Sequence, residues 1–121
     1  MKEIKRGEIY AVDFGTGFGS EQGGTRPSLI LQNDIGNRHS PTTIVAAITG
    51  RKTKAALPTH VIIMAKGLKT ESTVLLEQIR TIDKERLSEY IGSLDSKTLA
   101  AVDRAIVVSL GIKYLKELLN G

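Results

Sequence analysis

Residues 15–33 read G-T-G-F-G-S-E-Q-G-G-T-R-P-S-L-I-L-Q-N, and the rest of the chain can be interpreted as the scaffold around this stretch. Its first part holds five glycines and is typical of an open loop, which in a compact domain is usually functional or poorly ordered. Its second part is an apolar strand that begins at Pro27, where the missing N–H of proline costs least. Arg26 therefore stands where a glycine loop enters a rigid strand, and a guanidinium in that position can hold a phosphate.

The composition indicates one globular domain over residues 1–121, with 40% hydrophobic and 25% charged residues. The chain has no cysteine, which excludes disulfides and Cys-based metal sites. The net charge of +4 permits an anionic partner. No apolar segment approaches the roughly 20 residues that span a bilayer, and no apolar run follows the charged N-terminus as in a signal peptide. We therefore expect a cytoplasmic protein with no membrane partner.

The apolar pattern predicts six or seven short strands followed by one terminal helix. The expected strands are residues 7–14, 28–32, 42–49, 58–65, 72–76, 78–83 and 89–94, with the fourth at a sheet edge and a turn at 33–37. Asp83 is expected to cap one helical turn, and Asp95 a helix that runs to about Leu119, which Gly111 kinks or ends part-way. Short strands with short turns favour a small antiparallel barrel or sandwich.

Several polar residues in this framework have both a structural and a functional interpretation. Arg26 is either a surface or ion-paired arginine or a bidentate phosphate clamp. Thr49 ends an apolar strand, where it either caps the strand or meets a ligand. Glu77 and Gln78 interrupt a buried-looking run, so they either mark a strand junction or line a concave face.

The sequence offers no motif for metal or nucleotide chemistry. It has no GxxxxGK[ST] loop and no HExxH pair, and its G-x-G-x-G leads into a strand rather than the helix that a dinucleotide site requires. The two histidines are interpreted as a solvated turn residue, His39, and a half-exposed residue on an edge strand, His60. We therefore expect neither a metal nor a cofactor.

Taken together, K-R-G-E-I-Y-A-V-D-F, G-S-E-Q-G-G-T-R-P, L-Q-N-D-I-G-N, I-V-A-A-I-T and L-L-E-Q-I-R-T-I-D-K-E-R-L resemble the MazF/PemK/Kid toxin family. The resemblance is strongest to the MazF (EndoA) type of Firmicutes and runs in order from about Lys5 to Leu110. Relatives usually carry a proline within residues 15–18, where this chain has none. The resemblance implies a mainly β fold with a C-terminal helix, the small SH3-like barrel of the CcdB/MazF/Kid toxins.

The resemblance also implies a function, namely a metal-independent, sequence-specific endoribonuclease, or mRNA interferase, of a type II toxin–antitoxin system. Such toxins cleave single-stranded RNA (mRNA), in relatives of this type at U-A-C-A-U, and leave a 2′,3′-cyclic phosphate and a 5′-OH. The family's catalytic arginine and threonine fall on Arg26 and Thr49. Its RNA-contacting positions fall on Ser20, Glu21, Gln22, Glu77 and Gln78. Because the chain has few aromatic residues, Phe18 in the first loop is the expected side chain for stacking on a base.

The expected partners are a MazE-like antitoxin, whose acidic C-terminal segment covers the RNA groove, and a second copy of the chain. The dimer surface is expected on the outer side of the strand around Ile44–Ile48 and on the terminal helix. Two alternatives stay open, a non-catalytic RNA-binding homologue and a CcdB-like gyrase poison. The gyrase-binding tail of the latter resembles Trp-Gly-Ile, whereas this chain has no tryptophan and ends Leu119-Asn120-Gly121.

Overall fold

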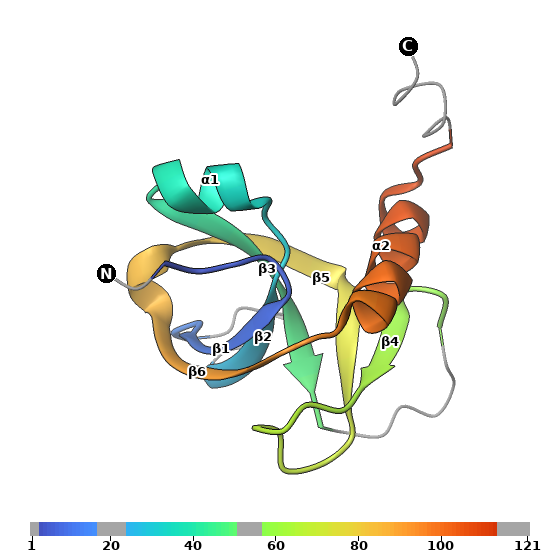
Figure 1. Ribbon diagram of the computed structural model, residues 1–121, viewed down its shortest axis with the longest axis horizontal. Coiled ribbons are helices and arrows are strands. Elements are labelled where there is room, and N and C mark those ends of the chain that lie inside the picture. Colours follow the sequence, from blue (N-terminus) through green and yellow to red (C-terminus); the bar gives the residue numbers. More distant parts are fainter. Residues whose placement is uncertain (1–2, 17–23, 51–56, 114–121) are drawn as a thin grey trace.

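A computed structural model describes residues 3–16, 24–50 and 57–113 of the chain. Six antiparallel strands form one strongly curved sheet in the order β4-β5-β3-β2-β1-β6, and two α-helices lie beside it (Figure 1). The elements are β1 (Glu8–Asp13), β2 (Thr25–Ile30), α1 (Asp34–His39), β3 (Thr42–Thr49), β4 (His60–Ile63), β5 (Ser72–Asp83), the 3₁₀ turn η1 (Lys84–Arg86), β6 (Leu87–Ser93) and α2 (Ser96–Leu110). The expected mainly β fold with a C-terminal helix is confirmed. No described helix is long and apolar enough to cross a membrane.

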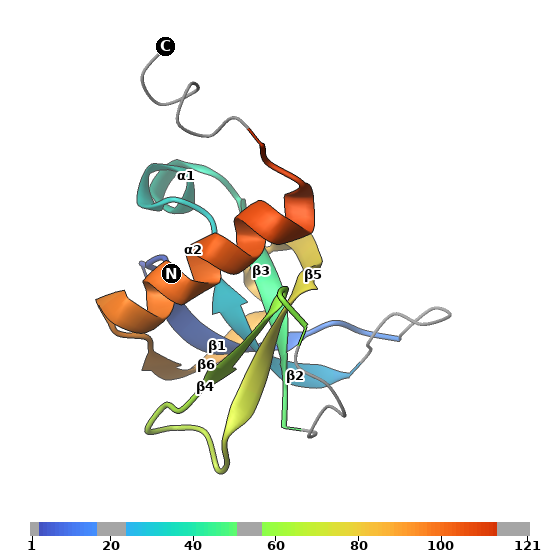
Figure 2. The same cartoon turned by 90° about the vertical axis from the view of Figure 1, so that its right-hand side faces the viewer.

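The sheet has a hydrophobic cluster on each face because its central strands are apolar throughout. Helix α2 crosses one face over β4 and β5 (Figure 2) and buries a cluster that includes Ile48, Leu76 and Val102. The opposite, concave face holds a second cluster, which includes Val12 and Val45. Neighbouring residues of β3 serve different faces, since Val45 belongs to the concave cluster and Ala46 to the cluster beneath α2. This alternation fixes which polar side chains share a face with the concave cluster.

Two helix caps were predicted correctly and one turn was not. Asp83 accepts a hydrogen bond from Glu85 N at the start of η1, and Asp95 accepts one from Thr98 N at the start of α2. The predicted turn at 33–37 is wrong, because Asn33 accepts a hydrogen bond from Gly36 N and caps the short helix α1.

Helix α2 also ends earlier than predicted. It stops at Leu110, and Gly111 follows in the left-handed conformation at φ 67°, which glycine adopts at little cost. The helix therefore does not run unbroken toward Leu119, and the prediction that Gly111 ends its first part is confirmed. Residues 114–119 of the predicted helix lie outside the described residues.

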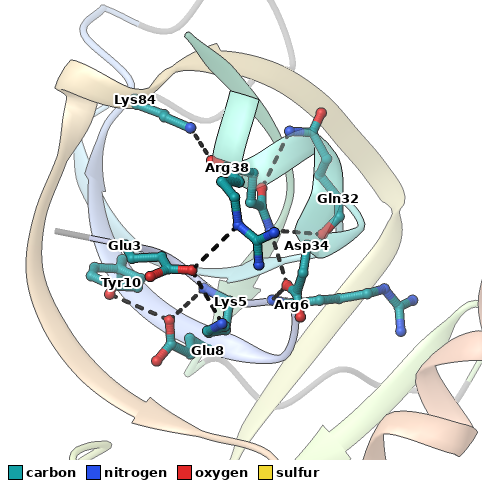
Figure 3. A network of polar contacts seen from close by, with 10 residues as sticks. Glu3, Lys5, Arg6, Glu8, Tyr10, Gln32, Asp34, Arg38 and Lys84 are labelled. Carbon is teal, nitrogen blue, oxygen red and sulfur yellow. Dashed lines mark hydrogen bonds and ion pairs between the residues drawn. The ribbon is translucent and has the colours of Figure 1, made fainter. Parts of the chain in front are cut away.

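A polar network joins the N-terminal segment to α1 (Figure 3), and Arg6 also reaches α2. Arg6 donates from its backbone N to Asp34 Oδ1 at 2.7 Å and from Nε to the Leu31 carbonyl at 2.7 Å. Its Nη2 pairs with Asp103 of α2 at 2.7 Å. The hydrogen bond from the Arg6 backbone holds the pKa of Asp34 below its ordinary value.

The lowered pKa of Asp34 makes this junction sensitive to acid. A carboxylate whose folded-state pKa is depressed stabilises the fold above its unfolded-state pKa, near 3.8, and loses that contribution as the pH falls through the folded-state value. We expect Asp34→Asn to cost about 0.5 kcal/mol at pH 7, because the carboxylate is exposed to water. Urea unfolding of both proteins from pH 7 to pH 2.5 would measure the difference, which should shrink below about pH 4. A difference that is independent of pH would contradict the assignment.

Candidate active site on the concave face

Arg26 is the second residue of β2, where it is half-buried and pairs with Val12 of β1. Gly24, just before the strand, has φ 77°, a conformation that side chains rarely adopt, so the chain can turn sharply into β2 at this point. The pairing and the proline-started strand fix the arginine backbone. Strand β2 begins at Thr25, earlier than the predicted residue 28, and residues 17–23 of the predicted loop lie outside the described residues.

Thr49 is the last residue of β3, is only 7% exposed and pairs with Thr73 of β5. Strands β2 and β3 are antiparallel, with Ser28 opposite Ala47. Continuing this register by two residues brings Arg26 level with Thr49. Directly opposite residues of an antiparallel pair carry their side chains on the same face, so the two predicted catalytic residues share one face of the sheet.

The face that Arg26 and Thr49 share is the concave one. Val12, opposite Arg26, belongs to the concave cluster, as does Val45, which alternation places on the same side of β3 as Thr49. Arg80 of β5 lies opposite Val45, and its guanidinium stacks 4.8 Å above the ring centroid of Phe14. A side chain of β5 and one that follows β1 therefore meet across the concavity, although β3 and β2 lie between these strands in the sheet.

Two further arginines border this end of the concave face, and the sequence reasoning did not single them out. Arg80 is exposed and stacked on Phe14, and Arg86 Nη1 donates to the Asp13 carbonyl at 3.0 Å. Alternate residues of a strand point to the same face, and Gln78 was expected to line a concave face. The same alternation would have placed Arg80 on that face, which is the face of Arg26. The position of Arg86 depends on η1 and was not readable from periodicity. Together with Arg26, these cations make the concave face attractive to a polyanion.

Glu77 and Gln78 lie in a bulge of β5. Neighbouring Ala46 and Ala47 of β3 pair with Ile79 and Leu75, so the three residues between these partners have no counterpart on β3. The predicted division of this segment into two strands is wrong, since β5 is continuous from Ser72 to Asp83. The bulge explains how strongly polar residues interrupt an otherwise buried run, because within it Glu77 is exposed and Gln78 half-buried, while Leu76 stays in the core.

His60 departs from its predicted half-exposed state. Its side chain is only 7% exposed, and Nε2 lies 2.9 Å from Glu77 Oε2. Burial alone would raise the pKa of Glu77, but hydrogen bonds from His60, from the Glu77 backbone and from Thr59 together outweigh it and lower this pKa. His39, the other histidine, is exposed in the last turn of α1, as expected of a solvated residue.

The remaining candidate residues of the first loop lie outside the described residues. These are the following: Phe18, Ser20, Glu21 and Gln22. The described part of the site is therefore a buried threonine and a half-buried arginine at one end of the concave face, bordered by two more arginines and by the Glu77–Gln78 bulge.

A comparison with protein families matches residues 5–110 to the PemK-like, MazF-like toxins of type II toxin–antitoxin systems. The chain belongs to this family. It is 56% identical over 111 residues to the endoribonuclease EndoA of Bacillus subtilis (strain 168), covering 90% of this MazF-like toxin and 96% of EndoA. The family and the type that the motifs indicated are thereby confirmed.

Solved structures agree with this assignment. A MazF from Deinococcus radiodurans superimposes with a TM-score of 0.79 at 26% identity, covering 93% of this MazF-like toxin and all of that chain. A mycobacterial endoribonuclease in complex with its cognate antitoxin gives a TM-score of 0.76 at 27% identity, covering 92% and 98% of the two chains. The curved sheet with α2 across one face is thus the MazF fold.

Proposed function

We propose that this endoribonuclease toxin cuts single-stranded RNA in the cytoplasm by letting a ribose 2′-OH attack its own 3′-phosphate. The products are a 2′,3′-cyclic phosphate and a 5′-OH. The observation that supports this most is that Arg26 and Thr49, each two residues beyond the paired Ser28 and Ala47, fall by alternation on one cationic concave face. Because the nucleophile belongs to the substrate, the reaction needs no metal ion, and the protein has only to align the phosphate and stabilise its charge.

Arg26 and Thr49 have complementary roles in this reaction. The planar guanidinium offers two parallel N–H donors to the non-bridging oxygens, and it gains most when the phosphate becomes a dianionic phosphorane. The Thr49 hydroxyl, 7% exposed at the strand end, donates one further hydrogen bond from a fixed direction. Arg26 also donates a hydrogen bond toward the leaving 5′-oxygen, which takes up a proton from water as the attacking 2′-OH gives one up to water, so the guanidinium stays charged throughout.

Sequence preference comes from side chains that read unstacked bases on their hydrogen-bonding edges. The Glu77 carboxylate accepts hydrogen bonds, and the Gln78 amide both donates and accepts them. Both residues are proposed to act beside the catalytic pair, Arg26 and Thr49. In the first loop, Ser20, Glu21 and Gln22 are proposed to read bases in the same way, and Phe18 is proposed to stack on a base. By similarity to its relatives, the chain is proposed to prefer U-A-C-A-U.

The natural inhibitor is proposed to be a MazE-like antitoxin with an acidic C-terminal segment. Carboxylates of such a segment would pair with Arg26, Arg80 and Arg86, the same cations that attract RNA phosphates. The mycobacterial relative in complex with its cognate antitoxin supports this assignment. The antitoxin and RNA would thus compete for one face.

The active unit is proposed to be a homodimer. Ile62 of β4 and Val108 of α2 expose 59% and 52% of their surface and line a groove of about 400 Å³ at the sheet edge. Met64 and Leu110, beside them in the chain, are 72% and 62% exposed. The predicted dimer surface was wrong for the Ile44–Ile48 strand, which is central and mostly buried. A second copy covering β4 and α2 would remove the exposed apolar patch from water.

The test is to incubate a long natural single-stranded RNA with the purified protein in EDTA and to map every new 5′ end. We expect discrete cuts at one short motif, each with a 5′-OH, at the same rate with and without the chelator. Cuts that disappear in EDTA would contradict the metal-free chemistry. An RNA that is bound but stays intact would favour the non-catalytic RNA-binding alternative, and an RNA that is neither cut nor bound would favour the gyrase poison.

A further inference from the structure

The side chain of Glu77 is held by two neighbouring residues at the start of the edge strand β4. His60 Nε2 contacts Glu77 Oε2 at 2.9 Å, and Thr59 Oγ1 donates to Glu77 Oε1 at 3.1 Å. Thr59 and His60 thus hold one carboxylate oxygen each, and the carboxylate, which also accepts from the Glu77 backbone, keeps lone pairs for another donor. The exposures are unequal, with His60 at 7% and Glu77 at 41%, so a buried imidazole supports a carboxylate that faces outward.

The protons of this contact can be assigned from the surroundings of His60. An ionised carboxylate only accepts hydrogen bonds, so Nε2 must carry the proton that it donates to Glu77. Nδ1 is buried and has no hydrogen-bond partner among the residues that the structure describes, so a proton there would lack an acceptor from them. Nε2 therefore presents its N–H toward Glu77.

Glu77 needs such support because it lies in the bulge, where no residue of β3 faces it. The same two β4-side residues also fix the backbone before it, since Leu76 N donates to the Thr59 carbonyl at 2.9 Å. From the other side, Ser109 Oγ of α2 donates to the Leu76 carbonyl at 2.6 Å. Without His60 the backbone stays in place, but the Glu77 side chain keeps only one of its two contacts with the β4 side, to Thr59, and gains torsional freedom.

His60, which holds the carboxylate, lies two strands from Thr49. His60 pairs with Leu75, which pairs with Ala47, one step along the same face of β3 from Thr49. With strands about 4.8 Å apart and about 3.4 Å per residue, the Cα atoms of His60 and Thr49 are about 12 Å apart. One bound RNA strand can therefore meet both Thr49 and Glu77.

We propose that His60 is a positioning residue that, with Thr59, aims the Glu77 carboxylate at the amino group of an RNA base near the cut. The matching base edge is the exocyclic amine of cytosine or adenine, which donates to a carboxylate. This role rests on the proposed function, because it deepens the part assigned to Glu77. His60 itself does not touch the RNA.

The test compares His60→Leu, which removes the donor, with His60→Gln, which retains a side-chain N–H. The substrate is an RNA pool randomised over the mapped motif, and sequencing of cut and uncut RNA gives the preference at each position. We expect the preference at one position of the motif to fall about tenfold in His60→Leu. The preference at the same position should be lost in Glu77→Gln. On the preferred RNA, KM should rise and kcat should change little. His60→Gln should recover most of the preference.

Three controls keep the result specific to His60. His39→Leu removes the exposed histidine of α1 and should leave every preference unchanged. Light scattering and circular dichroism check that His60→Leu keeps the wild-type mass and fold, because His60 also lines the groove between β4 and α2. If His60→Leu fails to fold, Thr59→Val removes the second donor and should shift the same position in the same direction, by less.

The proposal is overturned if Glu77→Gln loses a preference that both His60→Leu and Thr59→Val retain. It is also overturned if Glu77→Gln changes no preference, or if His60→Leu and Glu77→Gln change different positions. A wild-type protein that cuts nothing would contradict the proposed function instead. In that case, retention of the same RNA pool on the immobilised variants still decides the role of His60.

Discussion

Replacing Arg26 with alanine is expected to reduce RNA cleavage by on the order of 10³-fold while leaving the fold intact. The reason is that the guanidinium is proposed to meet charge that develops only in the phosphorane, so its loss acts on kcat more than on binding. Single-turnover cleavage of one labelled RNA at saturating protein would measure the effect. Arg26 is half-buried at the end of β2, and thermal unfolding should stay close to that of the wild type.

A matched control separates this chemical effect from the loss of one positive charge. Arg38→Ala removes the same charge from α1, beyond the opposite end of β2, where Arg38 pairs loosely with Glu3 at 3.8 Å. We expect its cleavage rate to stay within about twofold of the wild type, because exposed charges are screened by salt. Arg26→Lys should stay strongly impaired, since an ammonium lacks the planar pair of donors. A normal rate in Arg26→Ala would overturn the assignment of the site.

Much of the fold was readable from local sequence. Strands with continuous apolar runs, such as Thr42–Thr49, can only be central, and β3 does lie between β5 and β2. Helix starts were readable because Asp83 and Asp95 accept hydrogen bonds from the backbone two and three residues ahead. These features depend on near neighbours in the chain, which sequence patterns describe well.

The errors arose where distant partners decide the structure. The bulge at Glu77 exists because β5 pairs with β3 on both sides of it, and a run of residues in one strand does not reveal its register with another. His60 was expected to be half-exposed because alternation on an edge strand leaves one face open. The carboxylate that meets it comes from 17 residues farther along the chain.

The candidate site shows the same division. Arg26 could be singled out from the glycines before it and the proline after it, and Thr49 from its place at a strand end. The resemblance to the family implied that the two residues act together. That they lie level on one face depends on the pairing of Ser28 with Ala47, which local patterns could not supply. The cations Arg80 and Arg86 reach the same end of the concave face only through the curvature of the sheet and the turn η1.

The central claim, that the substrate supplies its own nucleophile, is tested most directly by removing one oxygen atom. An RNA with a single 2′-deoxy nucleotide on the 5′ side of the mapped cut keeps every base and every phosphate. We expect it to bind within about threefold of the all-ribose RNA, because phosphate and base contacts supply most of the affinity. We expect no product from it, since the attacking hydroxyl is gone.

The measurement uses the two RNAs side by side, each labelled at its 5′ end, with a second deoxy substitution two nucleotides away as the control. Only the substitution at the cut should block the reaction, and the all-ribose product should carry a 2′,3′-cyclic phosphate. Cleavage of the RNA that lacks the 2′-OH at the cut would contradict the account, because the attacking oxygen would then have to come from water or from the protein.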